Sequence, residues 1–353
     1  MSAQLTPALP AKTITAHVLV AVMIGVSMAL CYLGGFHKPD PHAVRVDVIG
    51  SGQTAQAVAG AVAEQAGDHF QVGITPSVES AKSAIEHRDL AGAVAMTPTE
   101  QTLYVSTAAG DATATILQRS FGQVASAKNQ VLHVVDVVPS DAEHDPAGGG
   151  IFFLMVALTV GAYGAGLAIA VAAGGRSIWV RLAFIGVFSV VVPAVVTGIA
   201  AFVYHALLSA GWAIFGLGIP YTLAVILTVA GLHIIIGRFT TLVTVTLFVA
   251  LNFTSSGGVY APELQPRFFA ALHDFWLGAG YNEAARNLMY FPNVGIAADL
   301  WKVFGWVIGA GVLVAAAAVY ERRKAAHDGT PAAPASHELN AEQYEELVEE
   351  VVG

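Results

Sequence analysis

The polar residues best suited to contact a ligand lie in one segment, residues 254–295, which follows a long apolar run and precedes another. Small residues interrupt a helix at its start, and ionisable residues follow. Charged side chains at membrane depth are costly, so they usually pair with one another or line a pathway. We therefore predict a substrate pathway formed by Ser255, Ser256, Gly257, Gly258, Glu263, Arg267, His273, Asp274 and Arg286.

A purely structural interpretation of these charges stays open. Glu263 and Arg267 are separated by four positions, and Glu283 and Arg286 by three. Side chains at these spacings meet on one face of a helix. The two pairs could therefore close a hairpin without touching a substrate.

Other candidate chemistry is sparse. His233 is the only strongly titratable residue well inside a predicted membrane span, which makes it a candidate proton relay. No acidic partner lies in the other predicted spans. Gly50-Ser51-Gly52 follows a predicted strand, as in a dinucleotide site, but a tight turn that starts a helix explains the pattern more simply.

The usual catalytic motifs do not occur in the sequence. There is no phosphate-binding G-x-x-x-x-G-K-[S/T] motif, no Cys/His spacing typical of zinc, and no specific Ser/His/Asp set. Cys31 is the single cysteine and lies within an apolar run. We predict that the chain is not an enzyme, with no catalytic residues, metal site or cofactor.

The elements that position the polar segment are those of a membrane protein. Apolar residues make up 55% of the 353 residues, charged residues make up 12%, and the mean hydropathy is +0.64. A soluble protein carries roughly 25% charged residues. Acidic residues are concentrated in residues 37–148 and after Tyr320. The net charge of −9 therefore belongs to the aqueous parts and argues against nucleic acid as a partner.

We predict an α-helical integral membrane protein with six transmembrane helices and an inserted extracytoplasmic α/β domain. Most of its apolar runs reach the ~20 residues that cross a bilayer, but the fifth, residues 239–253, is short. The predicted order is a cytoplasmic N-terminus (1–15), helix 1 (16–36), the extracytoplasmic domain (37–148), helices 2–5 (151–253), an outer re-entrant hairpin (254–295), helix 6 (296–320) and a cytoplasmic acidic tail (321–353).

Orientation follows from the basic residues in the short connections, which are enriched on the cytoplasmic side. They are Lys12, Arg176, Arg181, Arg238, Arg322, Arg323 and Lys324. Alternating crossings place all of them in the cytoplasm if the N-terminus is inside. The sequence therefore predicts a multi-pass plasma-membrane protein with both termini cytoplasmic.

The domain before the second span alternates strand-like and helix-like periods, which indicates a small α/β sandwich. Its predicted strands are residues 44–49, 70–74, 92–96, 103–106 and 131–138. Its predicted helices are residues 54–65, 77–88 and 112–128. In the tail, residues 338–352 could form a short amphipathic helix or a solvated, frayed terminus.

The order of one span, a large outer domain, four spans, an outer hairpin and a last span resembles the membrane subunits of ABC type-2 transporters. The run from Asn252 through Ser255 and Pro262 to Phe269, together with Arg286, is most similar to the YhgE/Pip (phage infection protein) branch. This resemblance implies a permease-like subunit, commonly dimeric, that moves hydrophobic or envelope-associated substrates outward in contact with membrane lipid.

Two features complicate this interpretation. The connection at residues 174–178 is too short for the helix that usually contacts a separate ATPase subunit. Charge is also scarce inside the spans. A non-transporting membrane scaffold that recruits envelope-assembly partners is therefore the alternative, while the hairpin and the prolines within the spans favour transport.

Overall fold

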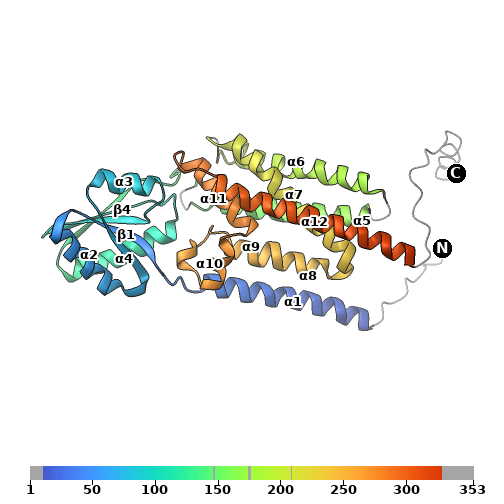
Figure 1. The fold of residues 1–353 in the computed structure, drawn as a ribbon, viewed down its shortest axis with the longest axis horizontal. Coiled ribbons are helices and arrows are strands. Elements are labelled where there is room, and N and C mark those ends of the chain that lie inside the picture. The colour runs from blue at the N-terminus through green and yellow to red at the C-terminus, as the bar shows by residue number, and fades with distance from the viewer. Residues whose placement is uncertain (1–10, 146–147, 174–175, 208, 328–353) are drawn as a thin grey trace, which may run out of the picture.

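The computed structural model describes residues 11–145, 148–173, 176–207 and 209–327 of the chain. It consists of a helical bundle and a smaller α/β domain beyond one end of that bundle (Figure 1). Among these described residues, five helical stretches are long and apolar enough to cross a membrane: Val18–Phe36, Gly150–Ala172, Ile178–Phe202, Gly211–Ser255 and Ala297–Lys324. The described chain is thus mostly helical, in the manner of a multi-pass membrane protein.

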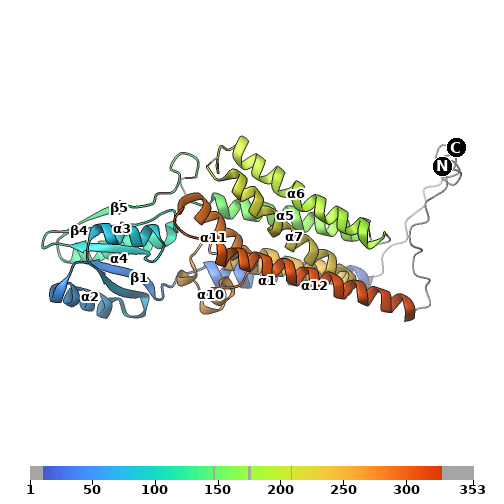
Figure 2. The same ribbon diagram turned by 45° about the horizontal axis from the view of Figure 1, so that its top comes forward.

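Helix α7 (Gly211–Ile236) lies at the centre of the bundle. It packs against α5 (Gly150–Ala172), α6 (Ile178–Phe202), α11 (Leu277–Tyr290) and α12 (Ala297–His327) (Figure 2). Buried residues follow one another along the middle of α7, whereas α6 and α12 expose large apolar side chains on their outer faces. A helix that is apolar all round is suited to this central position.

Helix α6 contains a proline and is hydrogen-bonded to α7 by one hydroxyl group. Pro193 lies inside α6 and has no N–H, so the carbonyl of Ser189 has no partner within the helix. The hydroxyl of Thr222 on α7 donates to that Ser189 oxygen at 2.8 Å. The proline thereby becomes a contact point between neighbouring helices.

The chain reverses direction after α7. Gly237 ends the helix with φ +52, a conformation that glycine adopts without strain. Four short elements follow: η2 (Gly237–Phe239), α8 (Thr240–Val245), the π-helical η3 (Thr246–Leu251) and α9 (Asn252–Ser255). Figure 1 shows α8 and α9 running back toward the α/β domain beside α1 (Ala11–Phe36). The predicted run 239–253 therefore lies in a series of short helical elements, Gly237–Ser255, of which Thr240–Ser255 is called the arm below.

Helix α1 contacts the bundle through this arm. Gly35 faces Thr254 so closely that a Cβ atom on Gly35 would overlap the threonine methyl group. The hydroxyl of Tyr32 donates to the carbonyl of Val249 at 3.2 Å, within the π-helical turn. Cys31 is buried next to Phe269 and Ala250. Close backbone approach, rather than bulky packing, attaches α1 to the arm.

The α/β domain has a five-stranded sheet in the order β2-β1-β3-β4-β5. Its strands are β1 (Val44–Ile49), β2 (Phe70–Thr75), β3 (Gly92–Met96), β4 (Glu100–Val105) and β5 (Val131–Asp136). Only the β3–β4 pair is antiparallel in this sheet. The parallel pairs are joined through α2 (Gly52–Ala66), the following η1 turn (Gly67–His69), α3 (Val78–Glu86) and α4 (Asp111–Ala127).

The two faces of the sheet have separate cores. Val44, Val46 and Val48 point from β1 toward α2 and α4, with exposures of 2%, 0% and 3%. Ile85 of α3 packs on the opposite face beside Ala93. Helices thus cover both sheet faces, as the alternating pattern predicts.

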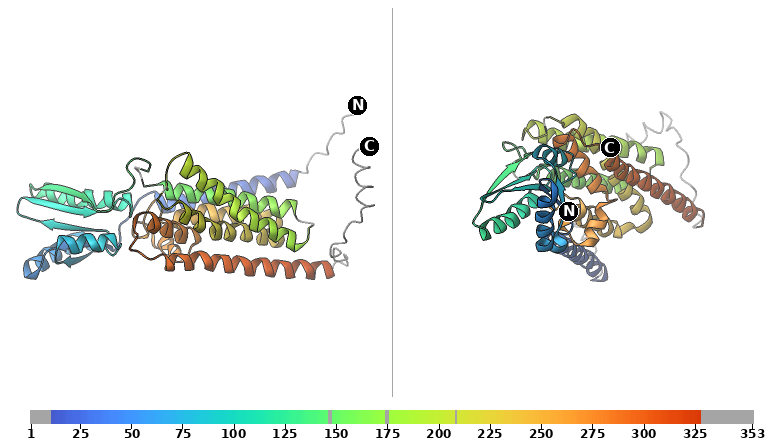
Figure 3. Two further views of the ribbon diagram at one scale, coloured as in Figure 1. Left: turned by 90° about the horizontal axis from the view of Figure 1, so that it is seen from above. Right: turned by 60° about the vertical axis from the view of Figure 1, so that its left-hand side comes forward.

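The α/β domain contacts the bundle at residues 254–295, which are called the hairpin segment below. Backbone N–H groups of Asp40 and His42 donate to the carbonyl groups of Leu264 and Glu263, at 3.1 and 2.9 Å. Leu264 belongs to the η4 turn (Pro262–Leu264) and is fully buried in the core of the α/β domain. The top view of Figure 3 shows the domain at one end of the elongated molecule.

Several element boundaries differ from the prediction. Helix α1 begins at Ala11 rather than residue 16, and α12 continues to His327 rather than residue 320. The extension of α12 carries Arg322, Arg323 and Lys324, whose long cationic side chains can reach the aqueous interface from the end of the helix. The predicted tail helix at residues 338–352 lies outside the described residues.

Candidate functional site

The hairpin segment is shaped by glycine and proline. Helix α9 ends at Ser255, and Gly257 then adopts φ +74. Pro262 starts η4, and Pro266 precedes α10 (Arg267–His273). Proline suits the first position of a helical turn because its N–H would have no partner there. Two short turns and α11 therefore replace a continuous helix.

A carboxylate between two guanidinium groups lies at the centre of this segment. Glu283 of α11 contacts Arg286 Nη1 through Oε1 and Arg88 Nη2 through Oε2, both at 2.6 Å. Arg286 Nη2 also donates to the carbonyl of Gly257 at 3.0 Å. The side chains of Glu283 and Arg286 are only 11% and 8% exposed. A buried charge is tolerated when it is paired in this way.

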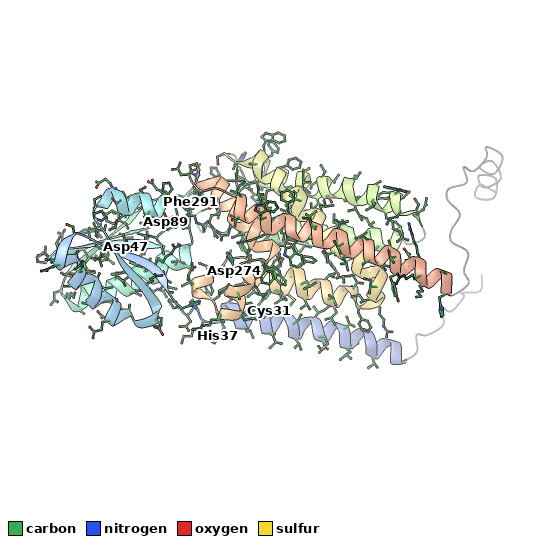
Figure 4. The ribbon with its side chains drawn as sticks, in the orientation of Figure 1. Cys31, His37, Asp47, Asp89, Asp274 and Phe291 are labelled. Atoms are coloured by element: carbon green, nitrogen blue, oxygen red, sulfur yellow. The ribbon has the colours of Figure 1, made fainter. Side chains whose placement is uncertain are left out.

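Arg88 reaches this carboxylate from the α/β domain, just after α3. Its backbone is left-handed with φ +62, which is uncommon for a residue other than glycine. The guanidinium group also donates to Asn287 Oδ1 at 2.6 Å and lies 5.3 Å from the centre of the Phe291 ring. Figure 4 shows Phe291 beside Asp89 at the junction between domain and bundle. One side chain therefore joins the two parts of the molecule.

Electrostatics fix the protonation states in this cluster. Burial alone would raise the pKa of Glu283, but Arg286 and Arg88 hold it well below its ordinary value. Burial lowers the pKa of His273, whose Nδ1 donates to the carbonyl of Ser255 at 3.0 Å. Glu283 is thus a carboxylate and His273 a neutral imidazole at neutral pH.

Polar contacts continue from the cluster to α12. Asn287 Nδ2 donates to Asp299 Oδ2 at 3.4 Å, and Lys302 Nζ lies 3.4 Å from Asp299 Oδ1. Gly280 permits this close approach of α11 and α12, because a Cβ atom there would lie 2.8 Å from Lys302 Cβ. Arg88, Asn287, Asp299 and Lys302 therefore form one chain of contacts.

A neutral network lies deeper in the bundle. The hydroxyl of Thr159 donates to Met155 O, so the Tyr221 hydroxyl donates to Thr159 at 2.5 Å and accepts from Asn252 Nδ2 at 2.9 Å. Asn252 Oδ1 accepts from the backbone N–H of Gly278 at 2.7 Å. This network joins α5, α7, α9 and α11, and its members are satisfied despite full burial.

A groove of about 730 Å³ runs along α12 beside the hairpin segment. At one end it is lined by Asp274, Lys302 and the aromatic residues Phe275, Trp301 and Trp306. The rest of its lining is apolar or small and includes Gly305, Gly309, Ala310, Leu313 and Thr228 of α7. The groove thus has one polar and one apolar end. Figure 4 places Asp274 in the region between α10 and α12.

The structure brings together only part of the predicted pathway. Ser255, Ser256 and Gly257 are buried beside His273 and the Glu283–Arg286 pair. Gly258 packs against Phe152. Among the described residues, no group of three or more His, Cys, Asp or Glu residues is placed to hold a metal ion.

The remaining predicted residues lie elsewhere. Asp274 is exposed in the groove, and Glu263 faces the α/β domain near Arg45. His233 lies in the last turn of α7, with its Nδ1 atom 3.5 Å from the Thr240 hydroxyl.

The two predicted ion pairs have different outcomes. The Glu283–Arg286 pair is confirmed. The Glu263–Arg267 pair is wrong for the described structure, since no ion pair joins them in the part of the chain that it covers. Glu263 belongs to η4, and α10 begins only after Pro266. The two residues therefore do not share one helix.

Sequence reasoning missed several members of the polar contacts, namely Arg88, Asn287, Asp299, Lys302, Tyr221 and Thr159. Arg88 was hidden because it lies 199 positions from Asn287. Asp299 and Lys302 carried a usable signal, since these two charges come directly before the long apolar run of α12.

Comparison with known proteins gives no relative. No family model matches the chain, and no curated protein or solved structure matches it either. The resemblance to ABC type-2 membrane subunits therefore stays a prediction made from the residues.

Proposed function

We propose that this chain is a permease-like membrane subunit that exports or translocates a hydrophobic or envelope-associated substrate. In this proposal the chain crosses the plasma membrane six times, with both termini in the cytoplasm and the α/β domain outside. The reversal at Gly237 supports counting α7 and the arm from Thr240 to Ser255 as two crossings.

The groove along α12 is the observation that carries this proposal. Its apolar part is open beside a helix whose outer face exposes Trp301, Ile308 and Val312, side chains suited to lipid. Its polar end contains Asp274, one of the predicted pathway residues. A site with one polar and one apolar end fits an amphipathic molecule that moves in from the membrane.

The buried cluster of Arg88, Glu283 and Arg286 helps to hold the elements around the α12 groove in place. Arg88, Glu283 and Arg286 fix the α/β domain and α11 to each other, and α11 in turn packs on α12. Most residues of the site lie on α12, and the two from the hairpin segment, Asp274 and Phe275, are held next to it. A separate ATPase subunit and a second copy of the chain are the partners that the proposal includes.

A membrane scaffold is the second candidate function, and two observations favour it. Ser255 and Ser256 of the predicted pathway are fully buried. The edge strand β5 exposes Val131 and Val134, at 57% and 44%, where a partner protein could add a strand. In this case the α/β domain would recruit partners and the groove would hold a structural lipid.

Blocking the groove separates the two functions. Gly309 lines the groove, and no atom lies within 4 Å of the position its Cβ would occupy. Gly309→Leu should therefore put a branched side chain into the groove, and its Cβ atom displaces no neighbour. Cells that lack the chain would be complemented with the wild type or this variant, and their envelope lipids and lipid-linked molecules compared by mass spectrometry.

Gly311→Leu is the matched control, because Gly311 also has open space around it on the same helix but does not line the groove. Transport predicts a species that is lost without the chain, restored by the wild type and Gly311→Leu, and not restored by Gly309→Leu. Full complementation by Gly309→Leu at equal protein level would reject the transport function.

A further inference from the structure

The polar end of the α12 groove contains one acidic and one basic side chain, Asp274 and Lys302, and only the lysine has an ion-pair partner in the described structure. Asp274 follows α10 and is exposed, and its carboxylate makes no ion pair or hydrogen bond in the part of the chain that the structure describes. Lys302 contacts Asp299 at the loose distance of 3.4 Å. One carboxylate and part of one ammonium group are thus available to a ligand.

The apolar part of the groove has the length of a lipid chain within one leaflet. Lys302 and Leu313 are both lining residues on α12. With a rise of 1.5 Å per residue, they are separated by about 16 Å along the helix. Half of a bilayer's hydrocarbon core is about 15 Å thick. The groove therefore matches one acyl chain with its headgroup at the level of Lys302.

The aromatic residues at the polar end fit the same depth. Trp301 is 74% exposed, and Trp306 Nε1 donates to the carbonyl of Phe275 at 3.0 Å. Tryptophan is enriched at the boundary between hydrocarbon and headgroups. The two tryptophans thus place the charged residues where a phospholipid has its phosphate and amine.

The balance of charge selects among headgroups. Asp274, Asp299 and Lys302 together carry a formal charge of −1, and the nearby Arg88 and Arg286 are paired with Glu283. In the groove, an anionic headgroup without an amine would meet the unpaired Asp274 carboxylate as well as Lys302, whose charge is shared with the buried Asp299. A headgroup with both an ammonium and a phosphate would instead satisfy Asp274 and Lys302 together.

We propose that this groove is a binding site for a zwitterionic aminophospholipid of the phosphoethanolamine class. The ammonium group donates to Asp274, the phosphate accepts from Lys302, and one acyl chain lies along Gly305 and Gly309. This inference rests on the proposed function, since it names the class of amphiphile that occupies the groove.

The test is lipid competition on the full-length chain. The protein would be placed in nanodiscs with equal amounts of phosphatidylethanolamine, phosphatidylcholine and phosphatidylglycerol, and retained lipids counted by native mass spectrometry. We expect phosphatidylethanolamine to be enriched several-fold over both others. Equal retention of phosphatidylglycerol would overturn the proposal. So would equal retention of phosphatidylcholine, whose quaternary amine cannot donate a hydrogen bond.

Variants locate the effect. Asp274→Asn should abolish the preference for phosphatidylethanolamine, and Lys302→Gln should weaken retention of all phospholipids in the groove. Glu263→Gln is the matched control, because it removes a carboxylate from the same hairpin segment but outside the groove. Asp274 contributes no described polar contact to the fold, so its substitution leaves the protein intact. A preference unchanged in Asp274→Asn would refute the headgroup assignment.

The result is independent of the transport assay. If Gly309→Leu fails to complement but no headgroup preference exists, the proposed function stands and the aminophospholipid assignment falls. If the preference exists and depends on Asp274 but Gly309→Leu complements fully, the lipid site stands and the transport function falls.

Discussion

Replacing Glu283 with glutamine tests the buried cluster most directly. Glu283→Gln keeps the shape of the side chain but removes the charge that lies 2.6 Å from both Arg88 and Arg286. Two guanidinium groups would then face each other across a neutral amide. The amide oxygen could accept from only one of them in the present geometry.

The expected cost follows from how buried each group is. Removing one partner of a buried ion pair costs about 3–5 kcal/mol, because the other charge is left without compensation. Arg286 is 8% exposed and would suffer this loss nearly in full. Arg88 is 22% exposed and keeps Asn287 and the Phe291 ring, so it would lose less. Because the glutamine oxygen still accepts from one of the two guanidinium groups, we expect the total to be about 3 kcal/mol, near the lower limit of that range.

The assay has a global and a local readout. The melting temperature of the detergent-purified chain should fall by about 4 °C, because the entropy of unfolding grows with the length of the chain. Hydrogen exchange should increase after α3, around Arg88, and in α11. The rest of the sheet should keep its protection, since its two cores do not include Glu283.

The order of effects can refute the reasoning. Arg286→Met leaves Glu283 paired with Arg88, so it should cost less than Glu283→Gln. Glu263→Gln, a carboxylate without an ion pair among the described residues, should change little. If Arg286→Met cost as much as Glu283→Gln, or Glu283→Gln left both readouts unchanged, the central carboxylate would not hold the cluster together.

Three further substitutions probe other parts of the fold. Gly257→Ala should destabilise the hairpin segment, because a residue with a Cβ atom pays about 1–2 kcal/mol to adopt the left-handed backbone of Gly257. The loss should exceed that amount, since the new Cβ would also lie 2.7 Å from His273 Cε1. Thermal unfolding measures this loss. Gly35→Ala should separate α1 from the arm and speed maleimide labelling of the buried Cys31. Burial raises the pKa of Asp47, so the α/β domain should lose stability as pH rises through that raised value. Asp47→Asn should remove this loss, as measured by melting against pH.

Two of these substitutions have a matched check. Gly25→Ala lies on the same helix as Gly35 with nothing within 4 Å, so its labelling rate should equal that of the wild type. For Asp47, the folded state prefers the protonated carboxyl, so wild type and Asp47→Asn should melt alike below the ordinary pKa and diverge above it. Greater stability of the wild type at neutral pH would contradict the burial argument.

The sequence predicts the α/β domain well because its signals are local. Alternating valines in residues 44–49 give β1 with the predicted bounds. The short run of small and apolar residues 92–96 gives β3, also with the predicted bounds. Turns rich in glycine and polar residues separate these strands from the helices. The predicted strand 103–106 begins at Glu100 instead, because Gln101 and Thr102 pair with β3 despite their polar side chains.

The site was less predictable because its contacts are not local. The helix-breaking run at Ser255 and the Glu283–Arg286 pair could be identified from spacing alone. The spacing rule failed for Glu263 because prolines break the helix that it assumes. Arg88 is one of many surface-like charges in a soluble domain, and only the docking of that domain on the hairpin reveals its partner.

The charge cluster and the groove are two ends of one set of contacts, which gives the α/β domain a physical connection to the proposed lipid site. Arg88 donates a hydrogen bond to Asn287, and Asn287 donates one to Asp299. Asp299 in turn contacts Lys302, which lines the groove. If Arg88 were withdrawn, Asn287 could turn away from Asp299. That carboxylate would then draw Lys302 more strongly and leave less of its charge for a phosphate. The position of the α/β domain would thereby set how well the groove holds a headgroup.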